Sequence, residues 1–161
     1  MLNEIVIDTN VLLHAGNSQE QRQEACIQLI AALHECDCHL CVDNGFSFEE
    51  AKNRSLIGSE YLKHLRFGSL GYEIVTHLAK TQRIKNVPTK VPQQTAKHIR
   101  MQITSLQDRT YVKVAFNSTG KTLISHDFGD ISDGARERLK TSIEVSIVDA
   151  ETGCAFLMQS G

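Results

Sequence analysis

The sequence lacks both a long apolar run and a strong excess of charge of either sign. No apolar stretch approaches the roughly 18 residues that a membrane-spanning helix needs, so we expect no membrane partner. The first residues do not combine a basic segment, an apolar segment and a cleavage site, so we expect no secretory signal and a cytoplasmic location. The formal net charge of -2, with 22% charged residues, is typical neither of a disordered tail nor of a polycation.

One segment of the chain is rich in cysteine and histidine, but no second segment supplies a further pair of metal ligands. The chain has 5 cysteines, an odd number, and nothing points to export, so we expect reduced thiols. The segment LHECDCHLC holds five potential zinc ligands, His34, Cys36, Cys38, His39 and Cys41. A structural zinc site usually takes two pairs of ligands from separated segments, but the remaining Cys154 stands alone. We therefore expect free thiols here rather than a zinc site.

Proline is also scarce, and both prolines fall within residues 83–94, which we expect to form a loop. Elsewhere, short apolar runs alternate with segments of helical periodicity. The runs predict strands at 5–8, 39–43, 122–125 and 142–148, and the periodic segments predict helices near 46–54, 58–66, 70–82, 94–103, 107–118 and 133–140. With 41% apolar residues, this alternation predicts a single domain over residues 1–161. The expected fold is α/β, a three-layer α/β/α sandwich around a mainly parallel sheet.

Acidic residues stand at the places where such a fold gathers function. Asp8 ends the first strand and Asp127 follows the strand at 122–125, so both lie at the carboxyl ends of strands. Glu50 and Asp108 fall on the apolar faces of predicted helices, where a carboxylate costs stability. Clustered carboxylates repel one another unless a cation neutralises them. These four acids therefore favour a site for a hard cation, Mg²⁺ or Mn²⁺.

The order and spacing of these acids resemble those of the PIN-domain ribonucleases. The segment VIDTNVLL resembles the opening motif of that family and contains Asp8, and FSFEEA resembles its second motif and contains Glu50. The segment DRTYVKVA begins with Asp108, and LISHDFGD contains Asp127, followed by Asp130 as a fifth acid. Glu49 is the alternative to Glu50 as the second acid. The resemblance runs from residue 4 to about residue 148.

What the resemblance implies is a metal-dependent endoribonuclease with an Mg²⁺ or Mn²⁺ site. The implied metal ligands are Asp8, Glu50, Asp108, Asp127 and Asp130. Thr9, Asn10 and Ser125 would order these carboxylates. His126 could contact phosphate, but we expect it to be an exposed turn residue. The number of ions, one or two, stays open. Many compact members are toxins of toxin–antitoxin pairs, so the resemblance implies an RNA substrate and allows an inhibitory antitoxin protein and a homodimer.

Acids are absent from Ile74 to Gln107, while this stretch carries six of the 17 basic residues. Such an asymmetry is typical of a surface that binds a polyanion. Arg83, Lys85 and Lys90 lie in or beside the predicted proline loop, so we expect them to contact nucleic acid.

Two other functions fit parts of the pattern. A PIN-like module without catalytic activity could bind nucleic acid, but all four acids of the implied site are present. A haloacid-dehalogenase-like phosphatase also begins with a strand that ends in Asp. That chemistry needs a second Asp two residues later, where this chain has Asn10.

Overall fold

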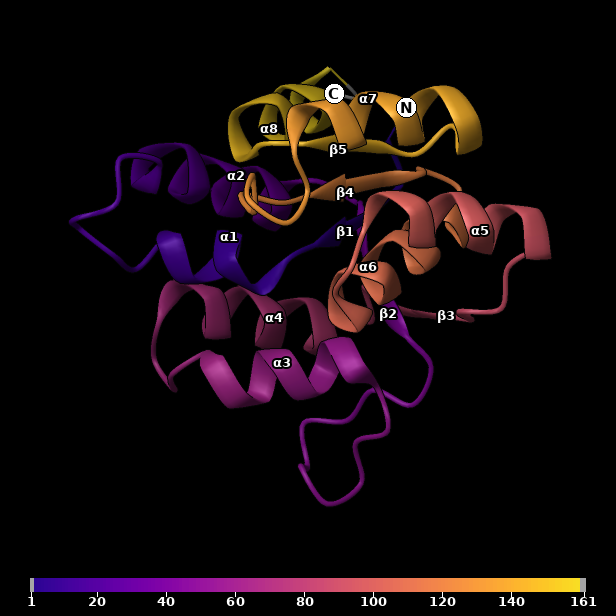
Figure 1. The fold of residues 1–161 in the computed structure, drawn as a ribbon. Coiled ribbons are helices and arrows are strands. Elements are labelled where there is room, and N and C mark those ends of the chain that lie inside the picture. The colour runs from indigo at the N-terminus through magenta and orange to yellow at the C-terminus, as the bar shows by residue number, and fades with distance from the viewer. Residues whose placement is uncertain (1, 160–161) are drawn as a thin grey trace.

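The computed structural model of the protein describes residues 2–159, and its centre is a five-stranded parallel sheet (Figure 1). The strands are β1 (Glu4–Ile7), β2 (His39–Asp43), β3 (Ile84–Val87), β4 (Thr122–Ile124) and β5 (Ser146–Val148). Their order across the sheet is β3-β2-β1-β4-β5, and every neighbouring pair is parallel. The predicted α/β class and parallel sheet are confirmed.

Helices cover both faces of the sheet and give the three-layer α/β/α arrangement (Figure 1). Within residues 2–159 they are α1 (Thr9–His14), α2 (Gln23–Glu35), α3 (Leu56–His64), α4 (Leu70–Lys80), α5 (Gln93–Gln102), α6 (Leu106–Asn117), α7 (Asp133–Ile143) and α8 (Ala150–Met158). Helix α6 packs on β1, β2 and β4, while α2 packs against α4 and α8. Among the described residues, no helix has both the length and the apolar character needed to cross a membrane.

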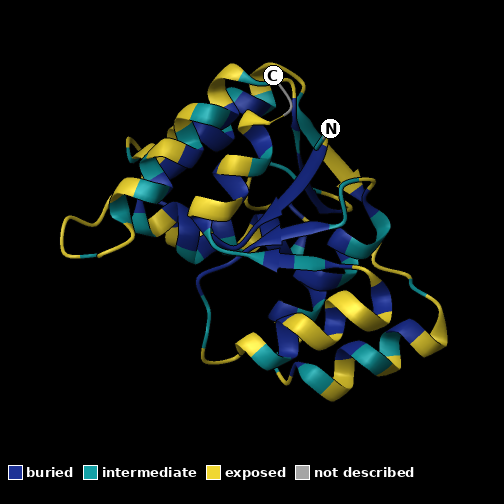
Figure 2. Cartoon of the chain, turned by 90° about the horizontal axis from the view of Figure 1, so that it is seen from above, coloured by how far each residue is buried: buried dark blue, intermediate teal, exposed yellow. Residues whose placement is uncertain are grey.

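The core is built on strands that are apolar on both sides. Ile5, Val6 and Ile7 are fully buried, as the continuous apolar run at the start of the chain requires between two helical layers. Figure 2 shows the sheet as the buried centre, with exposed residues confined mainly to the outer faces of the helices and to the loops.

The strand order places β1 and β4 side by side at the centre of the sheet. From β1 the sheet continues in one direction through β2 and β3, and in the other through β4 and β5. The backbone N–H of Asp8 donates to the carbonyl of Ile124 at 2.9 Å, so the two strands end next to each other. In open parallel sheets, a crevice for ligands forms outside the carboxyl ends at such a point.

The loop predicted at 83–94 is partly wrong, because it contains the edge strand β3. Lys85 and Asn86 are exposed there, and Val87 alone is buried, so the strand has no apolar run. An edge strand needs only one paired side, and its backbone pairs with residues 40–43 of β2. Helix α8, which follows β5, also lies beyond the helices that the sequence predicted.

The helix predicted at 46–54 is wrong. Residues 44–55 form a loop of bends and turns that projects beyond α3 (Figure 1), and the helix begins only at Leu56. Its N-terminus is fixed by Asp43, whose carboxylate accepts hydrogen bonds from the backbone N–H groups of Leu56 and Ile57 at 2.6 and 2.9 Å. Ser55 caps the same turn by accepting from Gly58, which explains the start of the helix.

Candidate active site

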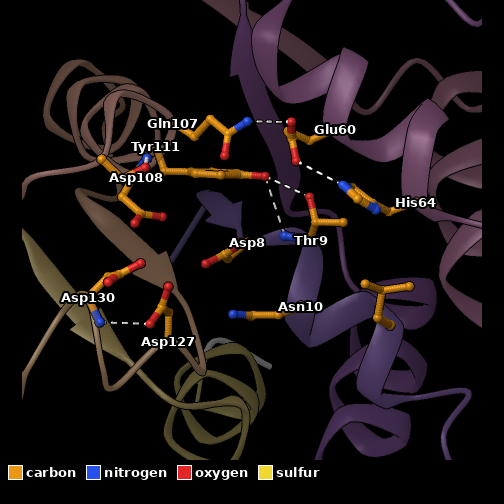
Figure 3. Close-up of a pocket in the computed structure, with 12 residues that line it drawn as sticks. Asp8, Thr9, Asn10, Glu60, His64, Gln107, Asp108, Tyr111, Asp127 and Asp130 are labelled. Carbon is orange, nitrogen blue, oxygen red and sulfur yellow. Dashed lines mark hydrogen bonds and ion pairs between the residues drawn. The ribbon is translucent and has the colours of Figure 1, made fainter.

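Acidic side chains from four separate elements line one hollow of about 230 Å³ at the carboxyl ends of β1 and β4. They are Asp8, Glu60, Asp108, Asp127 and Asp130. Figure 3 shows the carboxylates of Asp108, Asp127 and Asp130 gathered on one side of the hollow, with Asp8 beside them.

Asp8 directly follows β1 and is only 8% exposed. It occupies the N-cap position of α1, but its side chain makes no capping hydrogen bond. Its carboxylate instead accepts from the hydroxyl of Ser125 at 2.8 Å. Burial raises the pKa of Asp8, hydrogen bonds from Ser125 and from the backbone partly offset this, and the charge of Asp127 raises it further. The carboxylate is therefore held at the hollow rather than used to begin the helix.

Asp108 lies in the first turn of α6, and its side chain is buried on the sheet-facing side of that helix. Ser105 begins the helix by accepting from the backbone N–H of Asp108 at 3.4 Å. Burial, followed by the charges of Asp8, Asp127 and Asp130, raises the pKa of Asp108 to about 6. Burial is the larger cause, and the neighbouring acids add to it, so ionised Asp108 is destabilised both by loss of water and by like charges.

Asp127 and Asp130 share the turn that follows β4. The backbone N–H of Asp130 donates to Asp127 Oδ1 at 2.9 Å, and the N–H of Asp127 donates to Ser125 Oγ at 3.1 Å. One carboxylate oxygen each from Asp108, Asp127 and Asp130 lies within 4.8 Å of the others. Oxygen donors gathered in this way fit a hard divalent cation such as Mg²⁺ or Mn²⁺.

A buried arginine fixes the turn that carries these two acids. Arg136 of α7 is only 8% exposed and donates to three backbone carbonyls, those of Ser125, Asp127 and Ile131, at 3.0, 3.0 and 2.9 Å. Its guanidinium also lies 4.2 Å from the ring centroid of Phe128. The side chain thus binds the turn from within, and the sequence analysis did not identify it.

Glu50 does not line the hollow, so the structure does not bring it together with the other predicted acids. Both Glu50 and the alternative, Glu49, are exposed in the loop 44–55, and Glu49 forms an ion pair with Lys52 at 2.9 Å. The acid from this part of the chain that does reach the hollow is Glu60 of α3, which the sequence analysis missed. The available signal was its position on α3, directly before the buried Tyr61 and three residues after the buried Ile57.

Glu60 is held by two neighbours that also line the hollow (Figure 3). Gln107 of α6 donates to Glu60 Oε1 at 2.7 Å, and His64 Nε2 lies 3.2 Å from Glu60 Oε2. Helix α3 is thereby joined to α6 across the mouth of the hollow. Both carboxylate oxygens of Glu60 are thus engaged by neighbouring side chains, and Glu60 lines the hollow outside the close group of Asp108, Asp127 and Asp130.

The supporting roles expected of Thr9, Asn10 and Ser125 fit their contacts. Thr9 Oγ1 lies 2.7 Å from the hydroxyl of Tyr111, and both residues line the hollow. Asn10 Oδ1 accepts from the backbone N–H of His126 at 3.2 Å, which joins α1 to the turn after β4. Ser125 contacts Asp8 and the N–H of Asp127, so one hydroxyl connects the acids of the two strands.

No known protein family matches this chain, and no curated protein or solved structure is significantly similar to it. Its function must therefore be argued from the site.

His126 is not the exposed turn residue that the sequence predicted. It is 9% exposed, and its Nε2 accepts from the backbone N–H of Ala150 at the start of α8, at 3.0 Å. Nε2 therefore carries no proton, and the neutral ring places its proton on Nδ1, which lies 2.9 Å from His14 Nδ1. Burial first, and then the charges of His14 and Arg22, lower the pKa of His126 to about 4, so it joins α1 and α8 as a neutral side chain.

The cysteines are free thiols, as expected, and those of the segment 34–41 are largely buried. Burial raises the pKa of Cys38 and of Cys41 to about 12. Within residues 2–159, the groups of side chains whose atoms approach closely enough to share a metal ion do not include this segment.

The basic residues expected to contact nucleic acid do not line the hollow. Lys85 forms an ion pair with the buried Glu4, which begins β1 and so lies at the opposite end of that strand from Asp8. Arg83 donates to the carbonyl of Leu33 at the end of α2. Lys90 is exposed, in a loop whose carbonyl groups accept from Asn117. Arg83 and Lys85 thus serve contacts within the fold.

Replacing Lys85 by Met is expected to lower the free energy of unfolding by about 1 kcal/mol at pH 7, since the ion pair is half exposed. Burial raises the pKa of Glu4, but hydrogen bonds from Lys85 and Thr119 outweigh it and hold that pKa below its ordinary value. The stability contributed by ionised Glu4 is therefore present above its ordinary pKa and is lost as pH falls through the lowered one. Urea unfolding at pH 7 and at pH 3 checks this, and an equal loss at both values would contradict it.

Proposed function

We propose that the protein is a metal-dependent endoribonuclease. The observation that carries this proposal is the meeting of Asp8, Asp108, Asp127 and Asp130, with Glu60, in one open hollow at the carboxyl ends of β1 and β4. Burial first, and then the charges of neighbouring acids, raise the pKa values of Asp8 and Asp108, and a bound cation would offset both effects. The resemblance to PIN-domain ribonucleases favours RNA as the substrate, and an inhibitory partner protein stays a prediction of that resemblance.

In this proposal, Asp108, Asp127 and Asp130 would hold the ion, and Asp8 and Glu60 line the same hollow. A bound Mg²⁺ or Mn²⁺ would stabilise charge on the phosphodiester oxygens and lower the pKa of a water molecule. Ser125 keeps the carboxylate of Asp8 oriented, and Gln107 and His64 do the same for Glu60. Arg136 fixes the backbone of Asp127, so the donor positions are set before substrate arrives.

The direct test is cleavage of a labelled single-stranded RNA by the purified protein with Mg²⁺, with Mn²⁺ and with EDTA. We expect internal cleavage that requires one of the two ions, because the acids alone cannot neutralise the phosphate. Undiminished cleavage in EDTA, or no cleavage of any RNA with either ion, would refute the proposal.

A change of Asp108 to Asn is expected to stabilise the metal-free protein at pH 8. The folded-state pKa of about 6 is raised above the ordinary value of 3.8, so stability is full below pH 3.8 and is lost as pH rises through about 6. Removing the charge should raise the free energy of unfolding by about 1–2 kcal/mol at pH 8, after allowing for solvent in the open hollow.

Thermal unfolding of both proteins at pH 4 and pH 8, with and without Mg²⁺, measures this effect. The difference in melting temperature between the two proteins should be smaller at pH 4 than at pH 8. Mg²⁺ should raise the melting temperature of the wild type more than that of the variant. A variant that is less stable than the wild type at pH 8 without metal would show that Asp108 is compensated by the protein itself.

A further inference from the structure

A second hollow, of about 580 Å³, adjoins the acidic one. Leu13 of α1 and His64 at the end of α3 line both, so the two hollows lie side by side on the protein surface. The remaining walls of the second hollow are Leu12, Gly16, Asn17, Leu65, Arg66 and Ser69. It therefore lies between α1 with the residues that follow it and the turn that joins α3 to α4.

The close packing of α4 on α1 fixes the position of this turn. Gly71 lies so near α1 that an added Cβ atom would stand 2.8 Å from the carbonyl oxygen of Leu12. Ser69 caps α4 by accepting from Tyr72 and also donates to the carbonyl of Arg66 at 2.7 Å. The turn is thus held by contacts within the fold, and the second hollow is a lasting feature of the surface.

The two hollows differ sharply in charge. Five acidic side chains line the first, whereas the second has no acidic residue in its lining and includes Arg66 and His64. A polyanion that binds the acidic hollow through a cation would meet no repelling carboxylate among the residues that line the second hollow. Cleft walls of one sign of charge attract a ligand of the opposite sign, and Arg66 supplies that attraction here.

Phe67 follows Arg66 in the turn, next to but outside the lining of the second hollow, and leaves 87% of its surface in water. Its ring centroid lies 5.4 Å from that of Tyr72, at an interplanar angle of 57°, so one face of the ring remains open. Leu13 and Leu70 are 40% and 45% exposed. An exposed aromatic ring next to an arginine is the combination by which proteins bind single-stranded nucleic acid without reading its sequence, through stacking and phosphate contact.

We propose that the second hollow holds the single strand of RNA on one side of the scissile bond, with a phosphate at Arg66 and a base stacked on Phe67. This inference rests on the proposed nuclease function and names the path by which substrate enters the site. It replaces the expected path over residues 83–90, where Arg83 and Lys85 are already engaged with Leu33 and Glu4. A duplex of equal length cannot offer its stacked bases to Phe67 and should bind less tightly.

The test measures binding rather than cleavage. A fluorescent single-stranded RNA is titrated with protein that carries Asp127→Asn, so that it is not cut, and the titration is repeated at several salt concentrations. In this background, Phe67→Ala should weaken binding by roughly 5-fold to 150-fold, the range found for loss of one stacked base. Arg66→Gln should weaken it and reduce the slope of log affinity against log salt by about 0.7, as expected for one phosphate contact on a single strand.

Arg100 and Met101 of α5 provide a matched control. They are likewise an exposed arginine followed by an exposed apolar residue, with Met101 at 67% exposure, but they lie on α5, and Arg100, unlike Arg66, does not line the second hollow. Arg100→Gln and Met101→Ala should leave both affinity and salt slope unchanged. Loss of binding in the control pair to the same degree would indicate a diffuse electrostatic effect and overturn the inference.

The outcomes separate this inference from the proposed function. Unchanged RNA affinity and salt slope in Phe67→Ala and Arg66→Gln would overturn the substrate path and leave the exposed ring to a protein partner, even if the wild type cleaves RNA. Weakened binding by both variants supports the path. If the wild type then cleaves no RNA with Mg²⁺ or Mn²⁺, the nuclease proposal fails while the binding surface stands.

Discussion

Replacing Asp127 by Asn is expected to reduce Mg²⁺-dependent cleavage of RNA by more than about 100-fold, because loss of groups that merely support a metal site already costs about 10–100-fold. The change removes a charge at the point where Asp108, Asp127 and Asp130 converge. The fold should survive, since the amide oxygen of Asn can still accept from the backbone N–H of Asp130. Initial rates under saturating Mg²⁺, with circular dichroism of the variant, provide the measurement. Asp8→Asn should behave in the same way.

Glu60 and Glu50 provide a controlled comparison within this experiment. Glu60→Gln should lower the rate by at least about 10-fold, because the carboxylate lines the hollow. Glu50→Gln should leave the rate unchanged, because that side chain is exposed in the loop 44–55. The reverse result would return the second acid of the site to Glu50. Full activity of Asp127→Asn would remove the basis of the proposed mechanism.

Arg136→Met is expected to cause the largest loss of stability, about 3–5 kcal/mol in the free energy of unfolding, because each buried carbonyl that loses its donor costs about 1–3 kcal/mol. The change keeps most of the apolar bulk but leaves the carbonyls of Ser125, Asp127 and Ile131 without their shared donor. Those carbonyls belong to the segment that carries Asp127, so cleavage should also fall at temperatures where the variant is still folded. Urea unfolding and initial rates at a low temperature measure the two effects separately.

Arg138 serves as the control on the same helix. It is exposed and donates to Gln102 of α5 at 2.7 Å, so Arg138→Met should cost less than about 1 kcal/mol. Equal losses for the two variants would mean that the cost arises from helix α7 in general. In that case the buried contacts of Arg136 would not be what fixes the turn after β4.

The sequence predicted those parts of the fold in which local pattern and burial agree. The apolar run at residues 5–7 becomes the central strand, and the periodic segment near 107–118 becomes α6. The strand β3 was missed because its pairing with β2 depends on backbone hydrogen bonds that no side-chain pattern reports. The helix expected at 46–54 does not form, because hydrogen bonds to Asp43 and Ser55 make the helix begin at Leu56 instead.

The same distinction holds for the site. Asp8, Asp108 and Asp127 were found because each follows a strand or lies on an inward helix face, and the structure brings all three into one hollow. Glu60 was missed because its position at the hollow depends on how α3 packs against α6, and the sequence of α3 alone does not specify that packing. Arg136 reads as an ordinary helix residue until the turn after β4 is known to fold around it.

The chain between β2 and β3 forms a single excursion from the sheet, since it leaves after Asp43 and returns into a strand that pairs with β2. This excursion carries His64, Arg66 and Phe67, whereas the clustered aspartates belong to the strand ends and to α6. Under the two proposals, the chemistry and the holding of the single strand would therefore reside on separable pieces of the chain. If both proposals hold, exchanging the helical hairpin 56–80 for a variant with another turn, while keeping Glu60, would change how tightly a single strand is held without altering the group of aspartates.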